Sequence, residues 1–267
     1  MRVPSVALKT SRNLDTMPVT RTNIVERSTV RMKAFLLAAG LGTRLKPLTL
    51  HTPKCLVPVL CRPLLHYWID LFEQHGIDEV LINTHHLSRE VEQHLRSIQS
   101  SVLFHPVHEE QLLGSAGTVV RNKSFIDRGE SFFIIYADNL TDINLTALHE
   151  WHVNRHSPFT LALYHTQTPE ACGIIELDDQ SRVRSFIEKP EKPRSNLANT
   201  GIYLTDWRFL SHPLLENTKR PLDFGFDIFP HMSGHMMGVP IDAYLLDIGS
   251  HENLALAERT WPHGQTC

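Results

Sequence analysis

Residues 37–45, with the sequence LAAGLGTRL, contain two glycines followed by a basic residue, at the point where a short apolar run ends. Backbone N–H groups of such a turn can bind phosphate oxygens. Arg44 and Lys54 add positive charge at short spacing, which suits a triphosphate. The turn is not a P-loop, because no Gly-Lys-Ser/Thr follows, nor a dinucleotide fingerprint, because Leu45 stands at the third glycine position. A tight turn with solvated cations is the alternative reading.

Two aspartates each follow an apolar segment, as a metal ligand at the end of a strand would. Asp138 comes directly after SFFIIYA, and Asp247 ends AYLLD. Carboxylate oxygens are hard ligands of the kind that Mg²⁺ takes together with phosphate oxygens. A capping or turn aspartate is the alternative reading for each residue.

Two further segments carry groups suited to nucleotide or sugar phosphates. Small residues in Gly114-Ser-Ala-Gly117 would let a flat base approach the backbone, or would allow close packing of a helix on a sheet. Glu188 can accept hydrogen bonds from two hydroxyls, and Lys189 is a compact partner for phosphate. An exposed charge pair before a loop is the alternative reading of Glu188-Lys189.

The 17 histidines do not need a catalytic explanation. His149, His152 and His156 have spacings of three and four, which would place them on one helix face, but no H-E-x-x-H motif is present. We expect structural or surface roles for all three.

Alternating apolar strands and helical segments predict the fold that positions these groups. We expect strands at 33–39, 79–83, 102–105, 131–137 and 159–165, and helices at 63–75, 88–97 (capped by Ser88) and 145–155. This alternation predicts an α/β domain with a mostly parallel sheet. Later segments predict an added hairpin at 173–187, strands at 199–204 and 243–247, short helices near 206–210 and 225–232, and a last helix at 252–259.

Composition limits the class of protein. The chain has 267 residues, of which 42% are hydrophobic and 21% charged, and these values are typical of a globular protein. A formal net charge of −3 gives no overall attraction to nucleic acid, and no apolar run is long enough to span a membrane. Four cysteines without C-x-x-C spacing argue against a structural zinc site, and a chain of this length needs no disulfides for its core, which fits a reducing cytoplasm. We expect residues 1–31 to form a flexible extension or to reflect an over-long start, and residues 32–267 to form one catalytic domain.

The segment 33–49, followed by Pro53-Lys-Cys-Leu-Val-Pro58, resembles the signature of the sugar-phosphate nucleotidyltransferases. The resemblance extends from Met32 to Arg259, and 109–118 makes it closest to mannose-1-phosphate guanylyltransferase-like proteins. It implies a nucleotide-diphospho-sugar-transferase-like, Rossmann-type domain. Many guanylyltransferases also carry a C-terminal β-helix, whereas this chain stops soon after its last predicted helix.

The resemblance also implies roles for individual residues. Arg44, Lys54 and Lys189 would be the catalytic cations, and Asp138 and Asp247 would hold Mg²⁺. The nucleotide would bind at Ala39, Gly40, Gly42, Thr43, Arg44, Lys54, Gly114, Ala116 and Gly117. The sugar phosphate would bind at Asn139, Gly173, Glu188, Lys189, Asn199 and Gly201.

The implied reaction converts a nucleoside triphosphate and a sugar 1-phosphate into a nucleotide sugar and pyrophosphate. GTP and mannose 1-phosphate, or a related sugar, are the expected substrates. UTP or dTTP remains an alternative, as does a non-catalytic homologue that binds a nucleotide sugar and regulates a partner. A homo-oligomer is compatible with the sequence.

Overall fold

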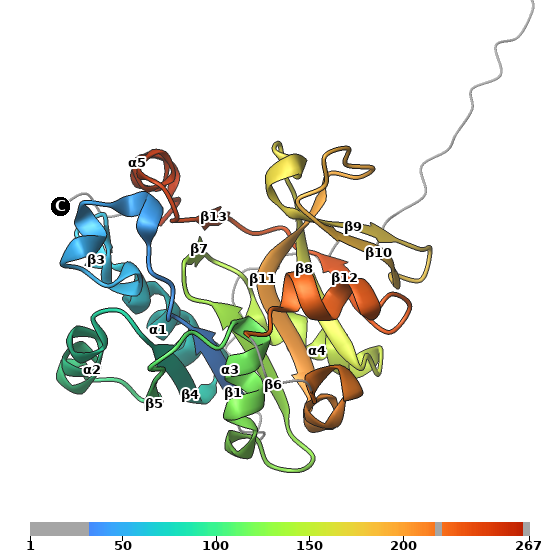
Figure 1. Cartoon of the computed structure of the whole chain (residues 1–267), viewed down its shortest axis with the longest axis horizontal. Coiled ribbons are helices and arrows are strands. Elements are labelled where there is room, and N and C mark those ends of the chain that lie inside the picture. Colours follow the sequence, from blue (N-terminus) through green and yellow to red (C-terminus); the bar gives the residue numbers. More distant parts are fainter. Residues whose placement is uncertain (1–31, 217–220, 264–267) are drawn as a thin grey trace, which may run out of the picture.

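A nine-stranded mixed sheet forms the centre of the computed structural model, which describes residues 32–216 and 221–263 (Figure 1). Seven strands follow the order β10-β9-β11-β6-β1-β4-β5, and β8 and β12 join through β11. The bounds are β1 Met32–Leu37, β4 Ile77–Thr84, β5 Leu103–His108, β6 Ser131–Tyr136, β8 Phe159–His165, β9 Gly173–Leu177, β10 Val183–Glu188, β11 Leu197–Asp206 and β12 Met237–Pro240.

Four neighbouring strands, β5, β4, β1 and β6, run parallel to one another. Their carboxyl ends therefore lie at one edge of the sheet, where ligands of open α/β folds bind. Strand β11 runs antiparallel to β6 and makes the whole sheet mixed. The single α/β domain with a parallel core is confirmed, and the hairpin predicted at 173–187 is formed by β9 and β10.

Helices cover both faces of the sheet (Figure 1). One buried cluster packs α1 (Leu64–His75), α2 (Ser88–Ser97) and α4 (Leu145–Asn154) on the face that carries Ala34 and Leu36 of β1. The other cluster packs α3 (Ser115–Arg121) and part of 207–236 on the face that carries Phe35. Alternate residues of β1 thus point to opposite layers, as the two-residue period of a strand requires.

Two small sheets and a last helix complete the edge where the site lies. Strand β7 (Asn139–Thr141) pairs with β13 (Leu245–Asp247), and β2 (Pro58–Val59) pairs with β3 (Arg62–Pro63). Helix α5 (His251–Thr260) follows, and its first turn is capped by Ser250. The sequence patterns did not predict β2, β3, β7 or β12, which are all short.

Several boundaries differ from the predictions. Strand β1 ends at Leu37 because the backbone leaves the sheet at Ala38, two residues before the predicted end. The prediction that Ser88 caps α2 was wrong: Leu87 enters the helix with a left-handed φ of 54°, and Ser88 is already the first helical residue. The helix expected at 225–232 is one π-turn, Phe224–Ile228, followed by a 3₁₀ turn, Phe229–His231.

Some expectations concern residues that the structure leaves undescribed. Residues 1–31, expected to be a flexible extension, lie outside the described residues, as do 217–220 and 264–267. Within the described ranges, every helix is too short or too polar to cross a lipid bilayer.

Candidate active site

A cavity of about 290 Å³ opens at the carboxyl edge of the parallel strands. The residues after β1, the ends of β4 and β6, and the start of α3 line it. They are Leu37, Ala38, Ala39, Gly40, Lys54, Cys55, Asn83, Glu109, Leu112, Gly114, Ser115, Thr118, Tyr136, Ala137, Asp138 and Asp223. Five of the residues predicted to bind nucleotide or metal are among them, namely Ala39, Gly40, Lys54, Gly114 and Asp138.

The two glycines of the first turn differ in what they do for the fold. Gly42 has a φ of 61°, and a Cβ there would lie 2.7 Å from the Thr49 methyl group. Thr49 Oγ1 also donates a hydrogen bond to the Gly42 carbonyl at 2.7 Å. Gly40 has no atom within 4 Å of an added Cβ. The backbone therefore requires Gly42, whereas the space beside Gly40 is open to a ligand.

Thr43 and Arg44 lie in the short turn Thr43–Leu45, next to Gly42. The Arg44 guanidinium contacts the Asp247 carboxylate at 3.3 Å. Neither Thr43 nor Arg44 lines the cavity itself, so this part of the predicted nucleotide site lies outside it.

Lys54 brings the two predicted metal ligands together. Its ammonium lies 2.5 Å from Asp138 Oδ2 and 3.5 Å from Asp247 Oδ1. The sum of these distances, 6.0 Å, is the upper limit for the separation of the two carboxylate oxygens. Pairing of β7 with β13 places Asp247 opposite Asn139, and the Ile248 N–H donates to the Asp138 carbonyl at 2.8 Å. The short pair of strands β7 and β13 thus brings together Asp138 and Asp247, which are 109 positions apart in the sequence.

The chemistry of this pair suits a divalent cation. Asp247 Oδ1 is buried and accepts no hydrogen bond, although Lys54 lies within ion-pair distance of it. Burial raises the pKa of the Asp247 carboxyl, and the neighbouring Asp138 raises it further. Lys54 and Arg44 oppose that rise in the pKa. Two hard carboxylates, one with an unsatisfied oxygen, are the ligands that Mg²⁺ takes beside phosphate.

The segment 114–117 is fixed by a distant part of the chain. The N–H groups of Ala116 and Gly117 donate to the Leu222 carbonyl at 2.9 and 3.0 Å. A Cβ on Gly114, whose φ is 79°, would lie 2.5 Å from the same oxygen. Close packing therefore explains the small residues of this segment, and these two backbone donors already have a partner within the chain.

The cavity residues that received no role from the sequence patterns include Asn83, Glu109, Tyr136 and Asp223. Asn83 and Tyr136 end or nearly end strands, and Glu109 directly follows one, a position that could have signalled them. Glu109 is 5% exposed, and its carboxylate accepts hydrogen bonds from Asn83, Thr118 and the Leu113 N–H. Asp223 accepts a hydrogen bond from Ser115 at 2.8 Å.

The predicted sugar-phosphate residues lie outside this cavity, and most of them contact one another. The Glu188 carboxylate occupies a slot between two glycines, since Oε2 lies 2.7 Å from a Cβ built on Gly173 and 2.8 Å from one built on Gly225. Burial raises the pKa of Glu188, and the charge of Asp223 adds to the rise, while Lys189 lowers it. Asp223 thus connects this slot with the cavity. The space that the sequence assigned to a sugar beside Gly173 is filled by Glu188.

Lys189 adopts the left-handed region, with a φ of 48°, and its N–H donates to the Cys172 carbonyl at 2.9 Å. A non-glycine residue in that region carries backbone strain, which is common at functional sites. Its side chain is exposed, and its contact with the sugar phosphate stays a prediction.

Asn139, Asn199 and Gly201 have partners within the fold. Asn139 is 7% exposed and donates to the Thr200 carbonyl at 2.9 Å. Asn199 donates to the Tyr203 hydroxyl at 2.8 Å and accepts from the Gly201 N–H. Gly201 has a φ of 76°, and the Tyr136 ring would contact a Cβ there. Their sugar contacts stay a prediction, because the space next to each is occupied.

The histidines have structural partners. His152 is buried and bonds Thr160 at 2.8 Å, and His149 bonds Ser131 at 3.1 Å. Across the ranges 32–216 and 221–263, no three His, Cys, Asp or Glu side chains gather as a metal site would require. A Mg²⁺ ion held by Asp138 and Asp247 would have two protein carboxylates and would take phosphate oxygens as further ligands.

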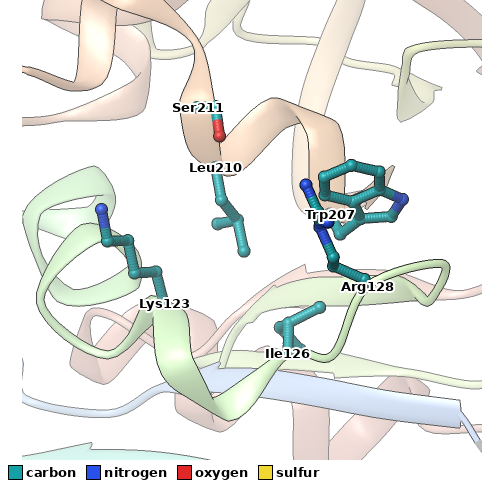
Figure 2. Close-up of a pocket in the computed structure, with 6 residues that line it drawn as sticks. All are labelled: Lys123, Ile126, Arg128, Trp207, Leu210 and Ser211. Atoms are coloured by element: carbon teal, nitrogen blue, oxygen red, sulfur yellow. The ribbon is translucent and has the colours of Figure 1, made fainter.

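A second cavity, of about 220 Å³, lies apart from these residues. Figure 2 shows it between the connection that follows α3 and the turn Trp207–Ser211. Its lining consists of Lys123, Ile126, Arg128, Trp207, Leu210 and Ser211. None of the predicted site residues belongs to it.

The chain matches the Nucleotidyl transferase family over residues 33–262, and it belongs to that family. It is 29% identical over 231 residues to a UTP–glucose-1-phosphate uridylyltransferase of Synechocystis, covering 81% of this chain and 58% of that protein. It is 28% identical over 224 residues to the catalytic subunit beta of mannose-1-phosphate guanylyltransferase from Danio rerio. This match covers 82% of this chain and 61% of that protein. The chain thus spans about 60% of the length of these curated relatives.

The fold also resembles solved structures. A crystal structure described as a glucose-1-phosphate thymidylyltransferase from Bacillus anthracis superposes with a TM-score of 0.76 at 24% identity, covering 88% of this chain and 96% of the other. The comparison supports the expected nucleotidyltransferase architecture.

Proposed function

We propose that the chain is a sugar-1-phosphate nucleotidyltransferase that makes GDP-mannose, or a related GDP-sugar, and pyrophosphate from GTP and the sugar 1-phosphate. The observation that carries this proposal is the meeting of Lys54, Asp138 and Asp247 beside the open face of Gly40. Phosphate-binding donors, cations and metal ligands are thereby gathered at one edge of the sheet. Family membership and the curated relatives support the same class of reaction.

The buried carboxylate of Glu109 favours guanine as the base. It lines the cavity together with Leu112 and Gly114, beside the segment predicted to hold the base. Guanine presents two adjacent donors, N1–H and the N2 amino group, and Glu109 Oε2, which accepts one hydrogen bond from the Leu113 N–H, has an acceptor site left for them. Uracil and thymine present one N–H between two carbonyl oxygens, which a carboxylate repels. The preference for GTP over UTP or dTTP rests on this argument.

Asp138 and Asp247 would hold Mg²⁺, which when bound supplies positive charge that neutralises phosphate oxygens and aligns the two anionic substrates. Arg44 and Lys54 bind the triphosphate and stabilise the charge that gathers on the leaving pyrophosphate. Both cations now contact these carboxylates, so they are within reach of phosphates bound at the same place.

The sugar phosphate approaches from the slot of Glu188 and Lys189. Glu188 accepts hydrogen bonds from sugar hydroxyls, and the Lys189 ammonium holds the phosphate. A phosphate oxygen of the sugar attacks the α-phosphorus in line with the departing pyrophosphate. Because the second pKa of a phosphate monoester is about 6, that oxygen is largely ionised near neutral pH and needs no strong general base. Positioning and charge stabilisation then supply most of the catalysis.

Two alternatives remain as outcomes of the test. A UTP- or dTTP-dependent enzyme would use the same cations and carboxylates. A non-catalytic regulatory homologue would bind a nucleotide sugar without turnover, but retention of Arg44, Lys54, Asp138, Lys189 and Asp247 argues against it. A cytoplasmic location and self-association stay predictions.

The test is pyrophosphate release by the full chain with five nucleoside triphosphates and a panel of sugar 1-phosphates in the presence of Mg²⁺. We expect the highest kcat/KM with GTP and mannose 1-phosphate or a related sugar. A higher kcat/KM with UTP or dTTP would show that the base assignment to guanine is wrong. Thermal shifts with these ligands, without pyrophosphate release from any pair of substrates, would show that the protein is a non-catalytic regulatory homologue.

A further inference from the structure

The side chain of Asn83 continues the sheet where the backbone of β1 stops. Leu37, the last residue of β1, lies opposite Asn83 in the parallel pair of β1 and β4. The next N–H, that of Ala38, has left the strand and donates to Asn83 Oδ1 at 2.7 Å. The first residue of the glycine-rich turn is therefore held by an asparagine from the neighbouring strand.

The other end of the same amide holds the Glu109 carboxylate. Asn83 Nδ2 donates to Glu109 Oε1 at 2.8 Å and lies 3.0 Å from Thr118 Oγ1. The Thr118 hydroxyl donates to the same carboxylate oxygen at 2.6 Å. The second oxygen, Oε2, accepts the Leu113 N–H at 3.0 Å.

This arrangement allows only one orientation of the amide. Asn83 is 4% exposed, and both its carbonyl and its amino group have partners. A flipped amide would place its amino group against the Ala38 N–H and its carbonyl against the Glu109 carboxylate, leaving donors and acceptors unsatisfied in a buried site.

The Glu109 charge depends on these neutral donors. Among residues 32–216 and 221–263, no Lys, Arg or His forms an ion pair with this buried carboxylate. A buried charge without a cation needs hydrogen bonds to stay ionised and in place. Removal of the Asn83 donor would therefore free the carboxylate to move.

We propose that Asn83 is a positioning residue that determines nucleotide specificity. One amide fixes the start of the phosphate-binding turn and the Glu109 carboxylate relative to each other, so that the phosphate and base contacts of one nucleotide have the correct spacing. The inference rests on the proposed function, because it takes Glu109 as the group that selects guanine.

Two substitutions distinguish the contact of the Asn83 amide with Ala38 from its contact with Glu109. Asn83→Asp keeps an acceptor for the Ala38 N–H but places a second carboxylate against Glu109. Thr118→Val keeps the Asn83 side chain but removes a hydroxyl that donates to Glu109 and also contacts Asn83 Nδ2 and the Gly114 carbonyl. We expect Asn83→Asp to lower the ratio of kcat/KM for GTP to that for UTP at least tenfold and to raise the KM for GTP at least tenfold. The KM for the sugar 1-phosphate should change less than twofold. Thr118→Val should move the same ratio by a smaller factor, and Thr118→Ser should restore it.

A matched control loses a buried hydrogen bond elsewhere. Thr160→Val removes the partner of His152 on the far side of the sheet and should leave both KM values and the nucleotide ratio unchanged. Equal losses with GTP and UTP in the Asn83→Asp and Thr118→Val variants would overturn the inference, as would an equal rise in both KM values. If Asn83→Asp does not fold, the nucleotide ratios of Thr118→Val and Thr118→Ser test the inference instead. If the wild type prefers another nucleotide, the proposed function fails, while the split between the two KM values still tests Asn83.

Discussion

The Lys54 ammonium lies between the carboxylates of Asp138 and Asp247, at 2.5 and 3.5 Å. The lysine side chain is 11% exposed, whereas the two carboxylates are 32% and 42% exposed, and Arg44 also pairs with Asp247. This edge of the sheet is therefore held together by charges that come from three separate segments.

Lys54→Met should weaken both substrate binding and the fold. Loss of the ammonium leaves two carboxylates to repel each other, and we expect the free energy of unfolding to fall by about 1–3 kcal/mol. The KM for GTP should rise at least tenfold. Urea denaturation and pyrophosphate release measure the two effects, with the exposed Lys46→Met as the control. A variant as stable as the wild type would show that the carboxylates do not need the lysine.

Asp138→Asn should lower turnover at least a hundredfold, the scale for loss of one key electrostatic group, while the fold stays intact. The amide keeps the size of the side chain but loses the charge that a divalent cation requires. Steady-state pyrophosphate release at saturating Mg²⁺ measures the change, and circular dichroism checks the fold. Asp70→Asn, in an exposed pair with Arg62, is the control. Near-normal turnover by the Asp138 variant would remove this residue from the metal site.

The two glycines of the phosphate-binding turn should respond differently to alanine. Gly42→Ala combines a left-handed φ of 61° with a 2.7 Å contact to Thr49, so we expect a loss of about 1–2 kcal/mol in stability. Gly40→Ala has room for its methyl group and should keep wild-type stability, yet raise the KM for GTP at least tenfold. Thermal unfolding and kinetics on the two variants test this. The interpretation of Gly40 is wrong if its alanine variant binds GTP normally.

Gly173→Ala should weaken binding of the sugar 1-phosphate without affecting binding of GTP. The added methyl would meet both Glu188 Oε2 and the Phe186 ring at 2.7 Å, which forces the carboxylate out of its slot. We expect the KM for the sugar 1-phosphate to rise at least tenfold and the KM for GTP to change less than twofold. Equal changes in both constants would instead indicate a general distortion of the sheet.

His152 should make stability depend on pH. Burial lowers its pKa from 6.5 to about 4, so the folded protein holds the neutral form. The unfolded chain binds a proton more readily below pH 6.5, and this contribution to stability is complete above pH 6.5 and declines as the pH falls toward 4. At pH 5 the loss from this residue is about 2 kcal/mol.

His152→Asn, which can keep a bond to Thr160, should show a smaller drop in unfolding free energy between pH 7 and pH 5. Urea denaturation at both values measures it, with the exposed His156→Asn as the control. An identical drop in wild type and His152→Asn would assign the acid sensitivity to other groups.

The sequence pattern predicted the parallel core, and the resemblance to the sugar-phosphate nucleotidyltransferases implied the approach of Asp138 to Asp247. The pattern did not predict β2, β3, β7 or β12, because a stretch such as Asn139–Thr141 is too short to show a period. The prediction that Ser88 caps α2 was wrong because the left-handed conformation of Leu87 cannot be inferred from its residue type. Asn83 and Glu109 escaped notice because their importance lies in contacts between strands, which local pattern does not report.

The segment Leu222–Asp223 contacts both the start of α3 and the surroundings of Glu188. The Leu222 carbonyl holds the first turn of α3, and the next residue, Asp223, bonds Ser115 and stands beside Gly225. A displacement of this segment would therefore alter the start of α3 and the slot around Glu188 together.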